Sequence, residues 1–151
     1  MNVVGLWEKL KPYPGGKWIF SRIMAHRIPY SGTVKPRVVD FSPGHAKIQL
    51  VDRRAVRNHL QSVHAVALMN LAELTSGLAM VGGLPDDLRG ILVGFRIEYL
   101  KKARGVLTAE SCCDVPKSQE RKQHEVMVEV KNSDGDTVCR AYATWLIGPS
   151  K

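Results

Sequence analysis

The chain has 151 residues, 44% of them hydrophobic, and a formal net charge of +8 with an isoelectric point near 9.6. This length provides the core of one domain, and the composition excludes a disordered or low-complexity protein. The charge favours an anionic partner, such as nucleic acid, a membrane surface or a phosphate-bearing small molecule. The basic residues are scattered and no aromatic motif accompanies them, so we expect no nucleic-acid partner.

The first residues lack the basic-then-apolar layout of a signal peptide, and no stretch approaches the ~20 apolar residues that cross a bilayer. We therefore expect a cytoplasmic protein with no transmembrane segment. Cys112, Cys113 and Cys139 have neither an even count nor a C-x-x-C spacing, which indicates buried reduced thiols. The histidines and cysteines show no metal-ligand spacing, so we expect no metal and no cofactor.

Residues 3–11 and 16–27 are predicted to form two short helices, because the run Pro12-Tyr13-Pro14-Gly15-Gly16 at their junction cannot continue a helix. The apolar stripe of the second helix consists of Trp18, Ile19, Ile23 and Met24. It indicates a helix packed on its own domain, with a membrane surface and a cover over an acyl pocket as alternatives. We assign residues 1–30 to an N-terminal helical extension and residues 31–151 to the main domain.

Strand and helix patterns follow in a clear order. Residues 32–41 and 45–51 are strand-like, and a nearly all-apolar helix follows at about 62–81, with Ser62 as its N-cap and Gly82-Gly83 at its end. Four more strands are expected at 90–100, 105–113, 123–131 and 136–147. Two strands, one long helix and four strands predict an α+β fold, an antiparallel sheet wrapped around a single central helix.

Glu73, in the middle of this helix, is its one carboxylate. A helix that is apolar on every side is normally buried, and a buried glutamate needs either a partner or a use. Glu73 can serve as a nucleophile or as the base that activates water. In the structural alternative, it bonds Asn70, Thr75 or Ser76 on neighbouring turns and helps the helix to pack.

The first turn of the helix is a second candidate feature. We expect the N–H groups of Val63, His64, Ala65 and Val66 to lack carbonyl partners and to form an anion site. Such donors suit a thioester carbonyl oxygen, whose negative charge grows as a nucleophile adds, and Asn58 adds a side-chain donor. His64 either contacts substrate, holds a loop or has a structural role.

The spacing of these features along the helix predicts an oligomer. Ala65 and Glu73 are eight residues apart, which is about 12 Å along a helix. If both act on one carbonyl, Glu73 comes from a second subunit whose helix runs antiparallel beside the first. We therefore expect a two-fold homodimer with its sites at the interface, alone or within a homotetramer.

The order of elements resembles the hotdog fold, and in particular the phenylacetate-pathway type of acyl-CoA thioesterase. The resemblance covers about residues 32–147 and depends on two runs, Asn-His-Leu-Gln-Ser-Val-His-Ala at 58–65 and Asn-Leu-Ala-Glu at 70–73. A little-characterised branch of the superfamily shares the first run and Glu-Tyr-Leu-Lys-Lys-Ala-Arg-Gly at 98–105. The resemblance implies hydrolysis of an acyl-CoA thioester.

In that family an Asn precedes a His-Gly-Gly at the start of the central helix, and an acidic residue lies nine positions after the His. Asn58, His64 and Glu73 match this spacing. The resemblance implies that Asn58 and the Ala65 N–H polarise the carbonyl while Glu73 of the partner subunit attacks it or activates water. Ala65 and Val66 replace the two family glycines, which keeps an amide donor but narrows the approach of the thioester.

Two basic clusters fit the phosphates of CoA or the acidic surface of an acyl carrier protein, with a solvated strand end as the alternative for each. They are Arg53, Arg54 and Arg57 before the helix, and Lys101, Lys102 and Arg104 between two strands. Further substrate contacts are expected from His59, Val66, Ser76 and Gly77. Pocket depth is expected to depend on Met69, Phe95, Trp145 and the N-terminal helices.

Two other functions remain open. Hotdog dehydratases pair a His with a Glu fourteen residues later, and His59 and Glu73 have this interval, but the Pro- and Gly-rich loop of those enzymes is absent. Asp40 and His45 have the spacing of hotdog hydratases but lie between the first two strands. A dimer that binds an acyl-CoA without cleaving it is the non-catalytic alternative.

Overall fold

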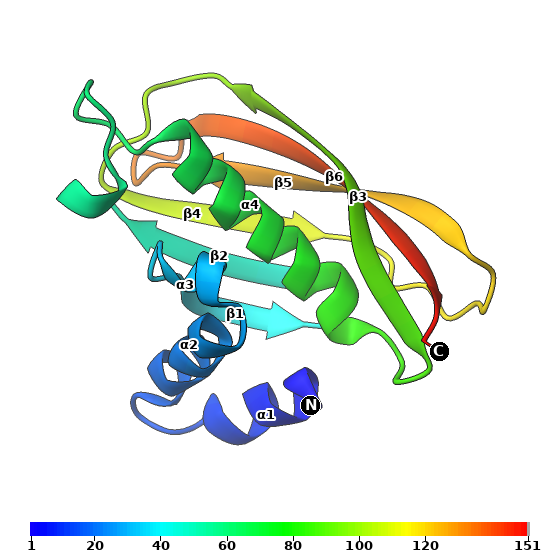
Figure 1. Ribbon diagram of the computed structural model, residues 1–151. Helices are drawn as coiled ribbons and strands as arrows, with labels where there is room; N and C mark the ends of the chain where they lie inside the picture. Colours follow the sequence, from blue (N-terminus) through cyan, green and yellow to red (C-terminus); the bar gives the residue numbers. More distant parts are fainter. Residues whose placement is uncertain (151) are drawn as a thin grey trace.

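The computed structural model describes residues 1–150 as an antiparallel sheet that curves around one long helix (Figure 1). The strands are β1 (Arg37–Ser42), β2 (His45–Val51), β3 (Leu88–Tyr99), β4 (Val106–Cys112), β5 (Lys122–Lys131) and β6 (Thr137–Pro149). The helices are α1 (Val3–Leu10), α2 (Gly16–Arg27), α3 (Pro29–Gly32) and α4 (Ala65–Met80), with 3-10 turns η1 (Arg54–Val56) and η2 (Val81–Gly83). The six strands have the order β1-β2-β4-β5-β6-β3. This arrangement confirms the predicted α+β hotdog fold.

Helix α4 is apolar on most of its circumference because it packs into the concave side of the sheet, mainly against β2, β4 and β5. Its ten buried residues include Leu71, Ala72 and Ala79, which are fully covered. Ala65–Gly83, with a mean hydropathy of 1.4, is long and apolar enough to cross a membrane, which corrects the expectation that no stretch approaches this length. Of its most apolar window, 61% is buried inside the protein, as in the core helix of a globular domain.

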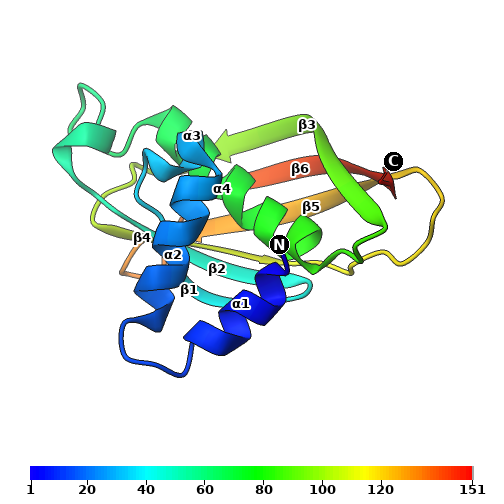
Figure 2. The same ribbon diagram turned by 60° about the horizontal axis from the view of Figure 1, so that its bottom comes forward.

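The N-terminal helices lie beside strand β1 (Figure 2), and their Trp7 and Phe20 belong to the hydrophobic core of the domain. The ring of Phe20 on α2 lies 5.0 Å from that of Trp7 on α1 and 6.1 Å from that of Phe41 on β1, measured between centroids. Packing of the second helix on its own domain is confirmed, but the predicted stripe is wrong because Trp18 and Ile19 are 64% and 43% exposed. The contacts with β1 instead select the face of α2 that carries Phe20. The boundary between residues 30 and 31 stays a prediction.

The largest differences from the predicted boundaries lie at the start of the first strand and at the start of the central helix. The first strand begins at Arg37, not at 32, because Pro29 starts the short helix α3 before it. The central helix begins at Ala65, not at 62, because Val63 pairs with Arg57 in an isolated β-bridge. Ser62 is therefore not the N-cap. Among the cysteines, Cys139 is buried and Cys113 half-buried as expected, whereas Cys112 is exposed.

Strand β3 is an edge of the sheet, hydrogen-bonded to β6 on one side only. Ile91 and Val93 on this strand are 46% and 48% exposed. The other edge strand, β1, lies against the N-terminal helices (Figure 1). One face of α4 thus looks out between β3 on one side and the α2–α3 segment on the other (Figure 2), and the candidate site lies along this face.

Candidate functional site

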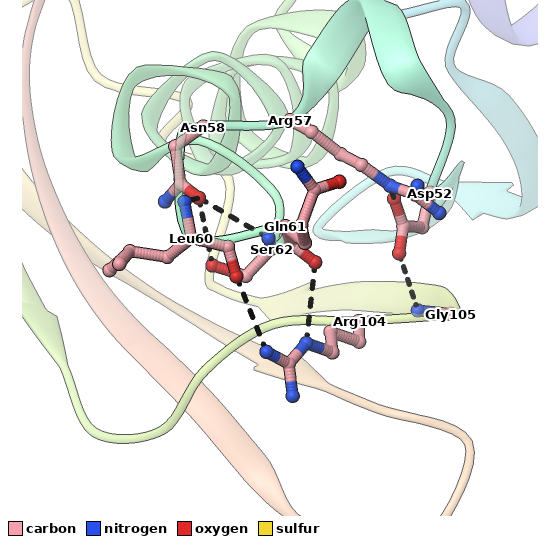
Figure 3. Close-up of polar contacts among 8 residues, drawn as sticks. All are labelled: Asp52, Arg57, Asn58, Leu60, Gln61, Ser62, Arg104 and Gly105. Carbon is pink, nitrogen blue, oxygen red and sulfur yellow. Dashed lines mark hydrogen bonds and ion pairs between the residues drawn. The ribbon is translucent and has the colours of Figure 1, made fainter.

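A tight turn at residues 58–62 leads into α4, and Asn58 organises it (Figure 3). The Oδ1 atom of Asn58 accepts hydrogen bonds from the backbone N–H of Leu60 at 2.9 Å and from both the N–H and the hydroxyl of Ser62 at 3.2 Å. Gln61 adopts a left-handed backbone, φ 57°, to complete the turn. The Nδ2 group of Asn58 points away from the turn and donates to no residue within 1–150, so it is free to donate to a ligand.

Residues from both predicted basic clusters meet at this turn. The Arg104 guanidinium donates to the carbonyl oxygens of Gln61 and Leu60, both at 3.3 Å (Figure 3). Arg57 pairs with Asp52 at 2.6 Å, and the backbone N–H of residue 105 also donates to this carboxylate. Burial favours a raised pKa for Asp52, but these hydrogen bonds outweigh it and hold the pKa below its ordinary value. The turn is therefore a braced structure with cationic groups around it.

The other cations of the two clusters differ in how free they are. Arg53 donates to the carbonyl of Thr33 at 2.7 Å, and Lys101 pairs with Asp136 at 2.6 Å. Arg54 and Lys102 are exposed, and their side chains have no partner among residues 1–150. These two charges are the ones most available to an anionic ligand.

The first turn of α4 offers fewer free donors than predicted. The N–H of Val63 donates to the Ala103 carbonyl and that of His64 to the Val56 carbonyl, both at 2.8 Å. His64 is the N-cap, and its Nδ1 accepts from the N–H of residue 66 at 3.0 Å, so the neutral ring carries its proton on Nε2. Of the four expected donors, only the Ala65 N–H has no acceptor within residues 1–150.

Glu73 has none of the partners that a structural role requires. Its carboxylate forms no hydrogen bond or ion pair with any residue from 1 to 150. The Thr75 hydroxyl donates to the Leu71 carbonyl, and the Ser76 hydroxyl donates to the main-chain oxygen of Glu73 and not to its carboxylate, so the structural alternative is wrong. Burial raises the pKa of Glu73 above its ordinary value of 4.5. A half-buried carboxylate with no partner is a candidate base or nucleophile.

Three cavities follow one another along the outward face of α4. The first, about 230 Å³, is lined by His64, Val66 and Asn70 near the start of the helix. The second, about 480 Å³, shares Val66 and Asn70 with the first and reaches Glu73. The third, about 400 Å³, begins at Glu73 and continues to the end of the helix. Glu73 therefore lies where the second and third cavities meet.

Most of the remaining predicted residues line these cavities. Met69 and Phe95 line the second cavity, while Gly77 and Trp145 line the third, as expected for pocket-lining residues. Ser76 is fully buried and accepts a hydrogen bond from the Trp145 indole, so it faces the core instead of a ligand.

Two candidate residues, His59 and His45, lie outside the three cavities along α4, and a third residue, Asn70, was not recognised from the sequence as part of the site. His59 is exposed in the 58–62 turn and lines none of the three cavities, and His45 pairs with Glu110 on the sheet. Asn70, which the sequence suggested only as a partner of Glu73, lines two cavities. Its Nδ2 donates to the Tyr30 carbonyl, and its Oδ1 has no partner among residues 1–150. The signal in the sequence that could have identified Asn70 was a polar amide within an otherwise apolar helix.

The sequence model of a family described as a domain of unknown function, DUF4442, matches residues 16–147, and the chain belongs to this family. The crystal structure of a structural-genomics protein is similar to this chain, with 30% identity over 99% of both chains and a TM-score of 0.83. No curated protein matches the sequence.

Two more distant structures show the fold. A Pseudomonas aeruginosa protein described as a probable thioesterase has 16% identity, covers 86% of this chain and 93% of its own, and gives a TM-score of 0.78. A thioesterase from Haemophilus influenzae has 13% identity, with 80% and 82% covered and a TM-score of 0.69. The chain thus has the fold of these thioesterases, as its resemblance to the hotdog superfamily implied.

Proposed function

We propose that this protein hydrolyses an acyl thioester carried by CoA or by an acyl carrier protein, with Glu73 as nucleophile or general base. The observation that carries this proposal is the Glu73 carboxylate, half-buried at the junction of two cavities and without a partner in residues 1–150. A folded protein keeps such a group at a cost to its stability, since burial opposes its charge. Chemistry on a bound ligand accounts for that cost.

The carbonyl oxygen of the substrate binds at the start of α4 in this proposal. The Ala65 N–H and the Asn58 Nδ2 are donors without an acceptor in the described chain, at the positive end of the helix dipole. The His64 side chain caps the helix and fixes the direction of its first N–H groups. Val66, 47% exposed, lies beside the thioester in this proposal, where the phenylacetate-pathway thioesterases that the chain resembles have glycine.

The two halves of the site come from different subunits in this proposal. Ala65 and Glu73 are separated by about 12 Å along α4, too far for one carbonyl. The free edge of β3, with exposed Ile91 and Val93, supports a two-fold dimer in which two such edges pair. Glu73 of one subunit then faces Ala65 of the other, and a dimer of dimers extends the same unit.

The carrier binds near the 58–62 turn in this proposal. Arg54 and Lys102 offer free charges there, and Arg57 and Arg104 add charge while they brace the turn. The phosphates of CoA or the acidic face of a carrier protein complement them. A cytoplasmic location fits such carriers and stays a prediction.

The test is thiol release from short, long and aromatic acyl-CoAs and from acyl carrier protein thioesters. We expect turnover by the wild type and its collapse in Glu73→Gln. Glu120→Gln makes the same chemical change in an exposed loop and is the matched control. Tight binding of an acyl-CoA without turnover would establish the non-catalytic dimer instead. Loss of water from a 3-hydroxyacyl thioester would establish the dehydratase.

A further inference from the structure

We propose that the cavity between α4 and the N-terminal helices holds the acyl chain of the substrate and limits its length. The inference rests on the proposed function, which puts the thioester at Glu73. Glu73 lines this third cavity, which extends from Glu73 to the end of α4. A substrate with its thioester carbonyl at Glu73 therefore has this cavity within reach of its acyl chain.

The walls of the cavity suit an unbranched hydrocarbon chain. The α4 side contributes Leu74, Gly77 and Leu78, and the indole of Trp145 on β6 adds an aromatic surface. The volume, about 400 Å³, is within the range of small-molecule sites, which bind ligands mainly through apolar contacts. Among the residues that line it, only Glu73 and Arg27 have charged side chains.

The N-terminal extension forms the opposite wall. Val3 on α1, Met24 on α2 and Ile28 after α2 all line the cavity. These helices are fixed in place, since their Trp7 and Phe20 rings pack into the core of the sheet. The depth of the cavity is therefore set by a rigid part of the same chain.

Gly77 allows the Trp145 ring to pack closely against α4. A Cβ atom at this position would lie 3.2 Å from the Trp145 ring, closer than ordinary van der Waals contact. A glycine inside a buried helix lowers helix stability relative to alanine, so its presence here needs a reason. The close packing of the Trp145 ring on α4 supplies one, and it fixes the indole where it forms part of the cavity wall.

In the proposed dimer, one substrate spans both subunits. The subunit that provides Ala65 also provides the basic turn for the carrier, and the subunit that provides Glu73 provides the cavity beside it. The acyl chain and the carrier are then recognised by different protomers. In this arrangement, the dependence of acyl-CoA affinity on chain length comes only from cavity residues of the subunit that provides Glu73.

The experiment measures dissociation constants by calorimetry for a series of unhydrolysable acyl-CoA thioethers of increasing chain length. We expect affinity for the wild type to rise about fourfold per added methylene until the cavity is full, and then to stop rising. Gly77→Ala should move this limit to a chain shorter by about one carbon, and Val3→Phe by about two, in line with the volume that each adds at the cavity wall. Val106→Phe, an exposed site on β4 outside the cavity, should leave the limit unchanged.

Each outcome decides the inference. Affinity that is independent of chain length, or a limit that neither Gly77→Ala nor Val3→Phe moves, would overturn it, and a second copy of the chain would then be the occupant to seek. Binding that depends on chain length without thiol release would contradict the proposed hydrolysis and support the third cavity as the acyl-binding site. Thiol release without any dependence of affinity on chain length would support hydrolysis and contradict acyl binding in the third cavity. Met24→Ala, which enlarges the cavity, should move the limit to longer chains and thus separates chain exclusion from damage to the fold.

Discussion

The turn before α4 and the middle of α4 differ in how fully their polar groups are hydrogen-bonded. At the 58–62 turn, Asn58 accepts three hydrogen bonds, Arg104 donates to two carbonyls and Arg57 pairs with Asp52. In the middle of the helix, the Glu73 carboxylate and the Asn70 Oδ1 have no partner among residues 1–150. The turn is built for rigidity, whereas the middle of α4 keeps groups that only a ligand can satisfy. Substitutions in the two regions should therefore have opposite effects on stability.

Glu73→Gln should show the largest effect. We expect kcat to fall on the order of 10²–10⁴-fold, because the base or nucleophile is removed while the shape is kept. The same variant should be more resistant to heat near pH 7, because burial of a charged carboxylate opposes folding. Turnover assays and thermal melts of the same preparation test both effects. Full activity in the variant would remove Glu73 from the mechanism.

Asn58→Ala should instead lose stability, by about 1–3 kcal/mol, because three donors at the turn lose their common acceptor. Asn58→Asp retains an acceptor at the same place but loses the Nδ2 donor. It should therefore keep most of the stability and still lose turnover. Urea unfolding and kcat, measured on both variants, separate the two roles. Equal turnover in Asn58→Asp and wild type would mean that Asn58 only shapes the turn.

Stability should depend on pH through Glu73. The Glu73 carboxyl binds its proton more tightly in the folded chain than in the unfolded chain, since burial raises the pKa of this carboxyl above 4.5. Stability from the neutral carboxyl is thus fully present below about pH 4.5 and is lost as pH rises through the raised pKa. The stabilisation in Glu73→Gln should appear at neutral pH and vanish near pH 4.5. Melting temperatures across this range, for variant and wild type, measure it. A gain that is independent of pH would contradict this cause.

The exposed cations should have the smallest effects. Arg54→Ala and Lys102→Ala should each raise KM for acyl-CoA roughly two- to fivefold, the range expected for an exposed charge pair, with no loss of stability. The effect should shrink at high salt and be absent with acyl-pantetheine, which lacks the nucleotide phosphates. An equal effect on both substrates would place these charges away from the carrier.

Much of the fold could be predicted from the sequence because its signals are local. Alternating apolar residues identified the strands, and an all-apolar run with one carboxylate identified both α4 and Glu73. The cavity between α4 and the N-terminal helices could not be predicted from such local patterns. It depends on where α1 and α2 lie against β1, which is decided by contacts between Trp7, Phe20 and Phe41 across long sequence distances.

The errors at the start of α4 have the same origin. The sequence suggested four free N–H donors, but the carbonyls of Val56 and Ala103 take two of them. Ala103 is 40 residues from its donor, Val63, and no local pattern could show this contact. The imidazole of His64 takes a third. Such pairings follow from the tertiary fold, so a helix start read from sequence overstates the donors available to a ligand.

The most direct test of a shared site is complementation between two inactive variants. Ala65→Pro removes the one free N–H, and proline is well tolerated at the first position of a helix. Glu73→Gln removes the carboxylate. Each homodimer should be inactive, and mixed dimers should recover about a quarter of wild-type turnover, because half of the dimers then contain one intact site. No recovery after subunit exchange, in a protein whose wild type releases thiol, would show that Ala65 and Glu73 do not act together across the interface.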